Sequence, residues 1–324
     1  MKRRLFLGVI ISAAFLWMAA RGIDWAQFRA SLARAQWIYL VPAIVLTMLG
    51  HFSRALRWKI MMNPIKRCGI GPLWSATAIA FMVNNLLPAR VGEFVRAFAI
   101  GRSEKVSRSA AFATIVYERV VDVFVLILLL WYCMVTISGP EWLGRSAGIL
   151  IVFNVALLAL LFAMVRWRAR FRAILAGAFR ALPDRARGRL DTSADSFIDG
   201  LGVVTQPRSL IPIALLSVVV WGCAVLGVYF CVLAFGFEIP FLASVFLIVI
   251  ISIGSMIPSA PAFLGTMQYA CVIGLAAFAV QRADALAYST IYHATQFFPI
   301  TIVGLYYAWR SQLHFSDLSG KQMN

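Results

Sequence analysis

The feature that most constrains this sequence is a series of long apolar runs with few charged side chains. A helix needs about 20 apolar residues to cross the hydrocarbon core of a bilayer, and several runs reach or approach that length. The chain is 62% hydrophobic and only 13% charged, whereas a soluble domain carries about 25% charged residues. The runs are continuous rather than alternating, which argues against a transmembrane β-barrel. They cover residues 5–20, 37–56, 73–87, 110–138, 147–165, 210–235, 241–257, 262–280 and 285–309.

These runs predict an all-α polytopic membrane protein with about six full spans and two re-entrant or broken helical hairpins. Lys and Arg accumulate in cytoplasmic loops, so the three basic residues after Met1 place the N-terminus in the cytoplasm. Alternating spans then place the other basic loops and the C-terminus on the same side. This bias accounts for the net charge of +17. Because no nucleic-acid-binding motif accompanies the charge, nucleic acid is not expected as a partner. Counting charges does not separate re-entrant hairpins from fully spanning ones.

We expect one transmembrane domain over 1–310 and a polar tail over 311–324. The first half of the domain covers 37–138, and the second half covers 210–309. Each half is predicted to consist of a span, an interrupted hairpin and a second span, and the two halves enter the membrane from opposite sides. This order predicts an inverted repeat. Hairpins interrupted by proline or glycine at corresponding places in two such halves indicate a transport site. The prolines alone would also suit an ordinary kinked core helix.

The insert between the halves, 166–208, is predicted to be cytoplasmic. Residues 166–189 hold eight arginines against one acid, Asp184. Apolar side chains at helical spacing predict an amphipathic interfacial helix, and the link to a second helix is expected to end near Gly188. The second helix carries an acidic stripe that could pair with the arginines. The alternative to this helical hairpin is that 166–208 forms a solvated charged loop that lies on anionic lipid. The apolar stripe consists of Phe171, Ile174, Leu175, Ala178, Phe179 and Leu182, and the acidic stripe of Asp191, Asp195 and Asp199.

Two charged clusters lie in or beside apolar runs. A lone charge at bilayer depth costs at least about 2.5–3.5 kcal/mol, so such groups pair with each other or face a wet cavity. One interpretation is an ion-pair network that clamps the first hairpin to the span 110–138. The other is a site for a polar ligand. The clusters are Arg90, Glu93 and Arg96, and Glu118, Arg119 and Asp122.

These six groups sum to zero charge and leave no surplus for an anion. Arg54 and Arg57, at the inner end of the second span, could change that balance. A guanidinium binds phosphate well because it presents paired planar donors. The N-terminus of a half-helix starting near Gly92 would add partial positive charge.

The second hairpin, IPSAPAFLGTMQYA, carries no formal charge. Pro258, Pro261 and Gly265 are expected to break it, and Gln268 supplies a neutral polar group. His293, in the last apolar run, is either a hydrogen-bonded packing residue or a proton relay. We see no catalytic or metal-binding motif, so neither enzymatic activity nor a cofactor is expected.

Four segments in order resemble the lysylphosphatidylglycerol synthase transmembrane family, a flippase-like domain. They are LLPARVGEFVRAF, YERVVDVFVLILL, IPSAPAFLGTMQYACVIGLAAF and YHATQFFPITIVGLYYAWR. The resemblance implies a helical membrane protein that handles polar lipids. No synthase domain follows Arg310, so no aminoacyltransferase activity is carried over. Two departures stand out, because Ala262 replaces a common glycine and Gln268 a common glutamate. The matching motif residues are Pro88, Arg90, Gly92, Glu93 and Arg96, then Glu118, Arg119 and Asp122, then Pro258, Pro261 and Gly265.

The function expected is flippase-like transport of polar lipids across a bacterial inner membrane, with Arg90 and Arg96 holding a head-group phosphate. The alternatives are a non-transporting scaffold for a lipid-modifying enzyme and a secondary transporter of a small organic anion. A lateral opening with an apolar lining would favour lipid, a closed polar cavity a small anion, and the absence of a cavity a scaffold. The expected partners are membrane lipids with phosphate-bearing or otherwise polar head groups, and a lipid-synthesising enzyme is a further candidate.

Overall fold

The computed structural model describes residues 2–88, 90–136, 141–178, 183–257 and 260–311, and all regular structure in these ranges is helical. The α-helices are α1 (Lys2–Ala20), α2 (Trp25–Arg34), α3 (Leu40–Met62), α4 (Ile70–Leu86), α5 (Gly92–Glu104), α6 (Arg108–Thr136), α7 (Glu141–Arg166), α8 (Arg168–Ala178), α9 (Asp184–Gly200), α10 (Pro207–Ala234), α11 (Phe241–Gly254), α12 (Thr266–Ala276) and α13 (Arg282–Arg310). Short 3-10 turns are η1 (Trp37–Tyr39), η3 (Leu201–Thr205) and η4 (Pro261–Phe263).

Three segments of the described chain are long and apolar enough to cross a membrane, namely Trp37–Met62, Arg108–Thr136 and Pro207–Ala234. A fourth is possible if α7 and α8, which meet at 94°, count as one bent span. The all-helical membrane character predicted from the sequence is therefore confirmed. The other two expected spans are helical as α1 and α13.

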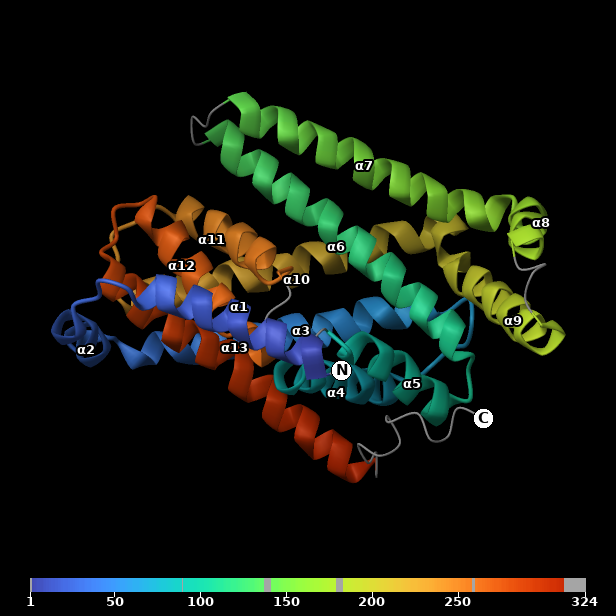
Figure 1. The fold of residues 1–324 in the computed structure, drawn as a ribbon, viewed down its shortest axis with the longest axis horizontal. Coiled ribbons are helices and arrows are strands. Elements are labelled where there is room, and N and C mark those ends of the chain that lie inside the picture. Colours follow the sequence, from blue (N-terminus) through green and yellow to red (C-terminus); the bar gives the residue numbers. More distant parts are fainter. Residues whose placement is uncertain (1, 89, 137–140, 179–182, 258–259, 312–324) are drawn as a thin grey trace.

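An antiparallel pair of helices, α3 and α10, forms the centre of the bundle (Figure 1). Next to the start of α3, the Gln36 N–H donates to Ala234 O at 2.7 Å. Near the other end, Arg57 Nη1 donates to Ser217 Oγ at 2.8 Å. Between these points Gly50 brings the two backbones close together, as small residues do at helix contacts in membranes.

Two helical hairpins flank this central pair. The first consists of α4 and α5, and α4 packs on α13 while α5 packs on α6. The second consists of α11 and α12, and α11 packs on α6 while α12 packs on α13. Exchanging α3 with α10, α4 with α11, α5 with α12 and α6 with α13 converts each of these pairings into another.

The hairpin helices are short. The longest, α4, has 17 residues, which span only about 26 Å, whereas the hydrocarbon core is about 30 Å thick. The other three have 13, 14 and 11 residues. Each of these helices is therefore too short to cross the core alone.

The first break has clear local causes. Leu87 is extended, with φ −120° and ψ 146°, because the residue before a proline avoids the helical region. Arg90 then takes a left-handed φ of 52°. A Cβ on Gly92 would lie 2.1 Å from Ala80 O, so a glycine is required for α5 to fold back against α4.

The second break is also built from left-handed residues, with φ 60° at Ala262, 57° at Phe263 and 85° at Gly265. Pro261 opens the 3-10 turn within it, and Pro258 lies outside the described residues. The positive φ at Ala262 gives a physical reason for glycine at this position, since only glycine takes such a φ without strain.

The insert lies at the end of the molecule opposite α2 (Figure 1). Its acidic and basic side chains pair, because Arg168 Nη1 lies 2.5 Å from Asp199 Oδ1 and Arg172 contacts Asp195. The second helix, α9, begins at Asp184 and runs through Gly188, so the link ends earlier than expected. Phe179 and Leu182 lie outside the described residues.

One short amphipathic helix, α2, was not predicted from the sequence. Asp24 caps it by accepting from the N–H groups of Ala26 and Gln27 at 2.8 and 3.1 Å. An aspartate before an amphipathic stretch is a recognised start signal for a helix, so this element could have been found.

Gly92→Ala should destabilise the protein by about 1–3 kcal/mol, because the new methyl group has no room beside the Ala80 carbonyl. Gly222→Ala is the matched control, since a Cβ there meets nothing within 4 Å. Thermal unfolding in detergent measures both. Equal midpoints for the two variants would contradict this packing of the hairpin.

Ala262→Gly should stabilise the protein. Relief of the left-handed strain, roughly 1–2 kcal/mol, exceeds the entropy that glycine adds to the unfolded chain, roughly 0.4–1 kcal/mol. The same unfolding assay should show a higher midpoint. A lower midpoint would contradict the left-handed conformation at Ala262.

Candidate functional site

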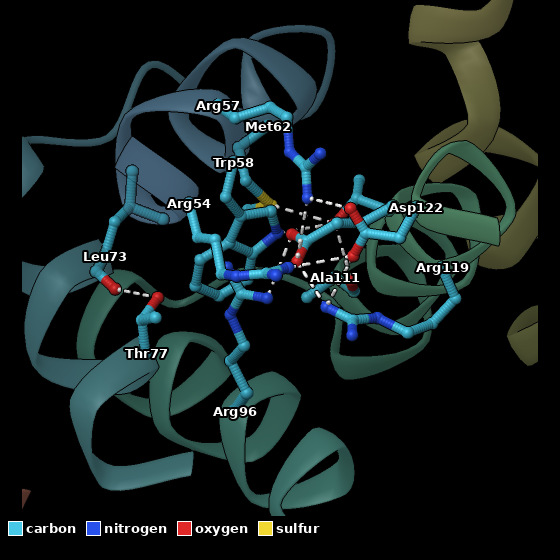
Figure 2. Close-up of polar contacts among 12 residues, drawn as sticks. Arg54, Arg57, Trp58, Met62, Leu73, Thr77, Arg96, Ala111, Arg119 and Asp122 are labelled. Atoms are coloured by element: carbon cyan, nitrogen blue, oxygen red, sulfur yellow. Dashed lines mark hydrogen bonds and ion pairs between the residues drawn. The ribbon is translucent and has the colours of Figure 1, made fainter. Parts of the chain in front are cut away.

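A buried ion-pair network joins α3, α5 and α6. Glu118 and Asp122 lie one turn apart on α6 and face the same way. Figure 2 shows the guanidinium groups of Arg54 and Arg57, on α3, converging on this point with that of Arg96, on α5. The network therefore ties the first hairpin to two of the long apolar helices.

Each carboxylate contacts three arginines. Around Glu118, the nearest contacts are 2.5 Å to Arg119 Nη2, 3.0 Å to Arg96 Nη1 and 3.5 Å to Arg57 Nη2. Around Asp122, they are 2.8 Å to Arg57 Nη2, 2.9 Å to Arg54 Nη1 and 3.4 Å to Arg119 Nη2. Four guanidinium groups thus share two carboxylates.

The network is largely removed from solvent. The side chains of Arg57 and Glu118 are fully buried, and that of Arg96 is 2% exposed. The Arg96 guanidinium stacks over the Trp58 ring at 3.9 Å, and Trp58 Nε1 donates to Thr114 Oγ1 at 2.8 Å. Several buried donors have no hydrogen-bond acceptor among the described residues: Arg57 Nε, Arg96 Nε and Nη2, and Arg119 Nε.

A cavity of about 380 Å³ lies beside the network, between the two hairpins. Arg54, Arg119 and Asp122 form one side of it, and apolar and aromatic side chains form much of the remainder. The full lining is Arg54, Phe81, Asn84, Asn85, Arg90, Glu93, Arg119, Asp122, Val123, Leu126, Trp221, Ser252, Ser255, Met256 and Phe263.

Arg90 and Glu93 also line this cavity but do not join the network. Arg90 Nη2 donates to Ser255 O at 2.8 Å and to Ser255 Oγ at 3.0 Å, so it links the tips of the two hairpins. Its guanidinium lies 5.3 Å from the Phe263 ring centre. Within the described chain, Glu93 is half-buried and has no ion pair within 4 Å. Of the three charges in this motif, only Arg96 pairs with α6.

The second hairpin has a neutral polar contact instead. Gln268 Nε2 lies 2.8 Å from His293 Nδ1, and Gln268 Oε1 accepts from the Gly265 N–H at 2.7 Å. Both side chains line a separate cavity of about 320 Å³, which has Phe297 and Phe298 among its walls.

The structure thus divides the predicted site residues into four groups. Arg54, Arg90, Glu93, Arg119 and Asp122 line the first cavity, while Arg57, Arg96 and Glu118 lie in the network but do not line it. Gln268 and His293 line the second cavity. Pro88, Gly92, Pro261 and Gly265 lie at the hairpin breaks, and Pro258 is not among the described residues.

Several polar side chains that form hydrogen bonds in the same region were not predicted from the sequence. Ser217 and Thr114 lie inside apolar runs, where a hydroxyl gives little signal. Asn84 could have been noticed, since two adjacent asparagines lie near the end of an apolar run, three and four residues before Pro88. Its Oδ1 accepts from the Gly92 N–H at 2.8 Å and satisfies the first turn of α5.

Comparison with known proteins now identifies the family. The sequence profile described as lysylphosphatidylglycerol synthase TM region matches residues 5–304. The chain belongs to this family. It is 23% identical to a UPF0104 membrane protein of Methanothermobacter thermautotrophicus, over 92% of each chain. It is 27% identical to a UPF0104 membrane protein of Pyrococcus horikoshii, over 93% of this chain and 94% of the relative.

A third relative is larger. The chain is 23% identical to the glycosyltransferase AglD of Haloferax volcanii, over 92% of this chain but only 52% of that protein. The region of AglD that is similar to this chain therefore makes up about half of AglD.

Glu118→Gln should cost about 3–5 kcal/mol of folding stability, because it leaves the buried Arg96 without a carboxylate partner and leaves Arg57 with Asp122 alone. Glu104→Gln is the matched control. Its partner Lys66 is 47% exposed, so the loss there should stay within about 1 kcal/mol. Equal unfolding midpoints for the two variants would contradict a buried network.

Proposed function

We propose that this protein is a flippase-like transporter of polar lipids and that the cavity between the two hairpins receives the head group. The observation that carries this proposal is the composition of that cavity, which combines three arginines with an extended apolar wall. A phosphate-bearing head group suits the arginines, since guanidinium groups present paired donors to phosphate oxygens. The apolar wall suits the start of a hydrocarbon chain.

The cavity also has an edge at the surface. Met256 lines it and is 52% exposed, on a helix–loop segment that would face the bilayer. A lipid could keep its chains among other lipids while its head group enters there. A carrier of small organic anions has no need of this apolar exposure, and a pure scaffold has no need of the cavity.

The arrangement of the helices supports an inverted repeat as the transport scaffold. The central pair is antiparallel, and exchanging corresponding helices reproduces the packing of the hairpins. Six spans, two re-entrant hairpins and cytoplasmic termini complete this proposal, with a bacterial inner membrane as the location. Two such halves can open alternately toward the two sides of the membrane around one site.

A second candidate, a membrane partner of a lipid-modifying enzyme, rests on a different observation. A protein named as a glycosyltransferase is similar to this chain over about half of its own length. This favours a functional association between this kind of membrane domain and a glycosyltransferase, and we propose a lipid as the molecule on which such an enzyme acts. Transport and association are compatible, and we assign no catalytic step to this chain.

The proposal predicts leaflet exchange of head-group-labelled lipids in proteoliposomes. Arg90→Gln should slow the exchange at least about tenfold, the loss expected from one charge-assisted hydrogen bond, because Arg90 lines the cavity. Arg29→Gln is the control, since Arg29 is an exposed arginine whose Nε donates to the Trp25 carbonyl within its own helix. Both variants must first be shown to unfold cooperatively in detergent, as the unmodified protein does. Absence of exchange with every lipid class tested, by the unmodified protein, would contradict the transport function.

A further inference from the structure

The charges around the first cavity do not balance. Its surroundings contain five arginines and three acids among the described residues, so formal charge leaves a surplus of two positive charges. The arginines are Arg54, Arg57, Arg90, Arg96 and Arg119, and the acids are Glu93, Glu118 and Asp122. Guanidinium groups stay protonated in proteins, so this surplus persists across the physiological pH range.

Such a surplus is costly where the charged side chains are buried, as those of Arg57, Arg96 and Glu118 are. A buried charge without a partner is strongly destabilising. Among the lining residues, Arg119 has a buried donor, Nε, without an acceptor in the described chain; the other orphan donors, in Arg57 and Arg96, belong to the network and do not line the cavity. A ligand that supplies two negative charges would complete the neutralisation. One that supplies a single negative charge would leave one guanidinium uncompensated.

We infer that the lipid head group bound here carries two negative charges on a terminal phosphate, as in a phosphate monoester or a diphosphate, rather than the single charge of a phosphodiester. This inference rests on the proposed function and narrows it to a substrate class. Common phospholipids with a bridged head group would then be poor ligands.

The geometry of the cations agrees with a terminal phosphate. Arg54, Arg90 and Arg119 approach the cavity from three different segments, namely α3, the first break and α6. A phosphate monoester offers three unesterified oxygens and a phosphodiester only two. Three separate guanidinium groups therefore match the monoester in number of acceptors as well as in charge.

Glu93 sets the size of the surplus. It is the acid of the lining that has no ion pair within 4 Å in the described chain, whereas Asp122 is held by three arginines. Removing the charge of Glu93 raises the surplus from two to three, and removing that of Arg90 lowers it to one. Glu93→Gln and Arg90→Gln should thus change ligand selectivity in opposite directions.

Two matched lipids test the inference. Phosphatidic acid is a phosphate monoester and phosphatidylglycerol a phosphodiester, and both can carry identical acyl chains. Binding to the purified full chain in detergent is measured by native mass spectrometry or by displacement of a fluorescent lipid. At pH 8 we expect phosphatidic acid to bind about tenfold more tightly, because it forms an additional charge interaction in a site of low dielectric.

The pH dependence provides a second readout. The second ionisation of a phosphate monoester lies near pH 6, so phosphatidic acid gains negative charge between pH 5 and pH 8, and its binding should tighten. Phosphatidylglycerol stays singly charged and reports any titration of the protein. Besides the arginines and acids already named, His51 lies near the site, behind the lining residue Phe81 with ring centres 4.2 Å apart.

The variants sharpen the result. Glu93→Gln should increase the preference for phosphatidic acid, Arg90→Gln should reduce it to near unity, and Arg29→Gln, the exposed control, should not change it. If Arg90→Gln fails to fold, the increase in Glu93→Gln still decides. Equal affinities for the two lipids at both pH values, with exchange intact, would overturn this inference and leave the transport function standing.

Inorganic phosphate separates a lipid site from a site for the free anion. If phosphate alone binds as tightly as phosphatidic acid, the ligand is a small anion, and both the inference and the lipid function fail. If neither lipid binds and none is exchanged, the proposed function itself fails.

Discussion

The structure depends on one constraint, which is that charged side chains buried in a membrane protein have to pair with one another. Glu118 and Asp122 on α6 are the only acids in the described network, and they hold arginines from α3, α5 and α6 itself. In a bilayer these arginines cannot be left to solvent, so the helices that carry them must converge. The short helix α5 is placed by this requirement as much as by apolar packing. The same convergence leaves one side of Arg54 and Arg119 facing a cavity.

The two hairpins are attached to their neighbouring long helices by different kinds of polar contact. Each has a short helix after its break, and each such helix is fixed to the neighbouring long helix by one buried polar pair. In the first hairpin the pair is Arg96 and Glu118, at 3.0 Å. In the second it is Gln268 and His293, at 2.8 Å. Glutamine at position 268 is therefore a neutral donor to a ring nitrogen, and the second hairpin is held without a charged pair at this point.

Much of the architecture could be read from the sequence because it follows from composition and from helix breakers. The continuous apolar runs predict long helices, and Pro88 with Gly92 predicts the first break. The pairing of Arg96 with Glu118 also follows from the cost of lone charges in lipid. The deep position of Arg57 does not follow, because a basic residue near the end of a span reads equally well as a cytoplasmic anchor. Nor does the contact of Arg90 with Ser255, which joins positions 165 residues apart and depends on how two hairpins meet.

The position of the network within the chain has a consequence for biogenesis. Its charged members lie between Arg54 and Asp122, inside the first half of the sequence. The opposite wall of the cavity, from Trp221 to Phe263, is made later. At the usual rate of translation the roughly 140 residues between Asp122 and Phe263 take on the order of ten seconds to emerge. The arginines and acids of the network can thus form their ion pairs while the second half of the chain is still being synthesised, so these charges are paired in the membrane before the later wall of the cavity exists.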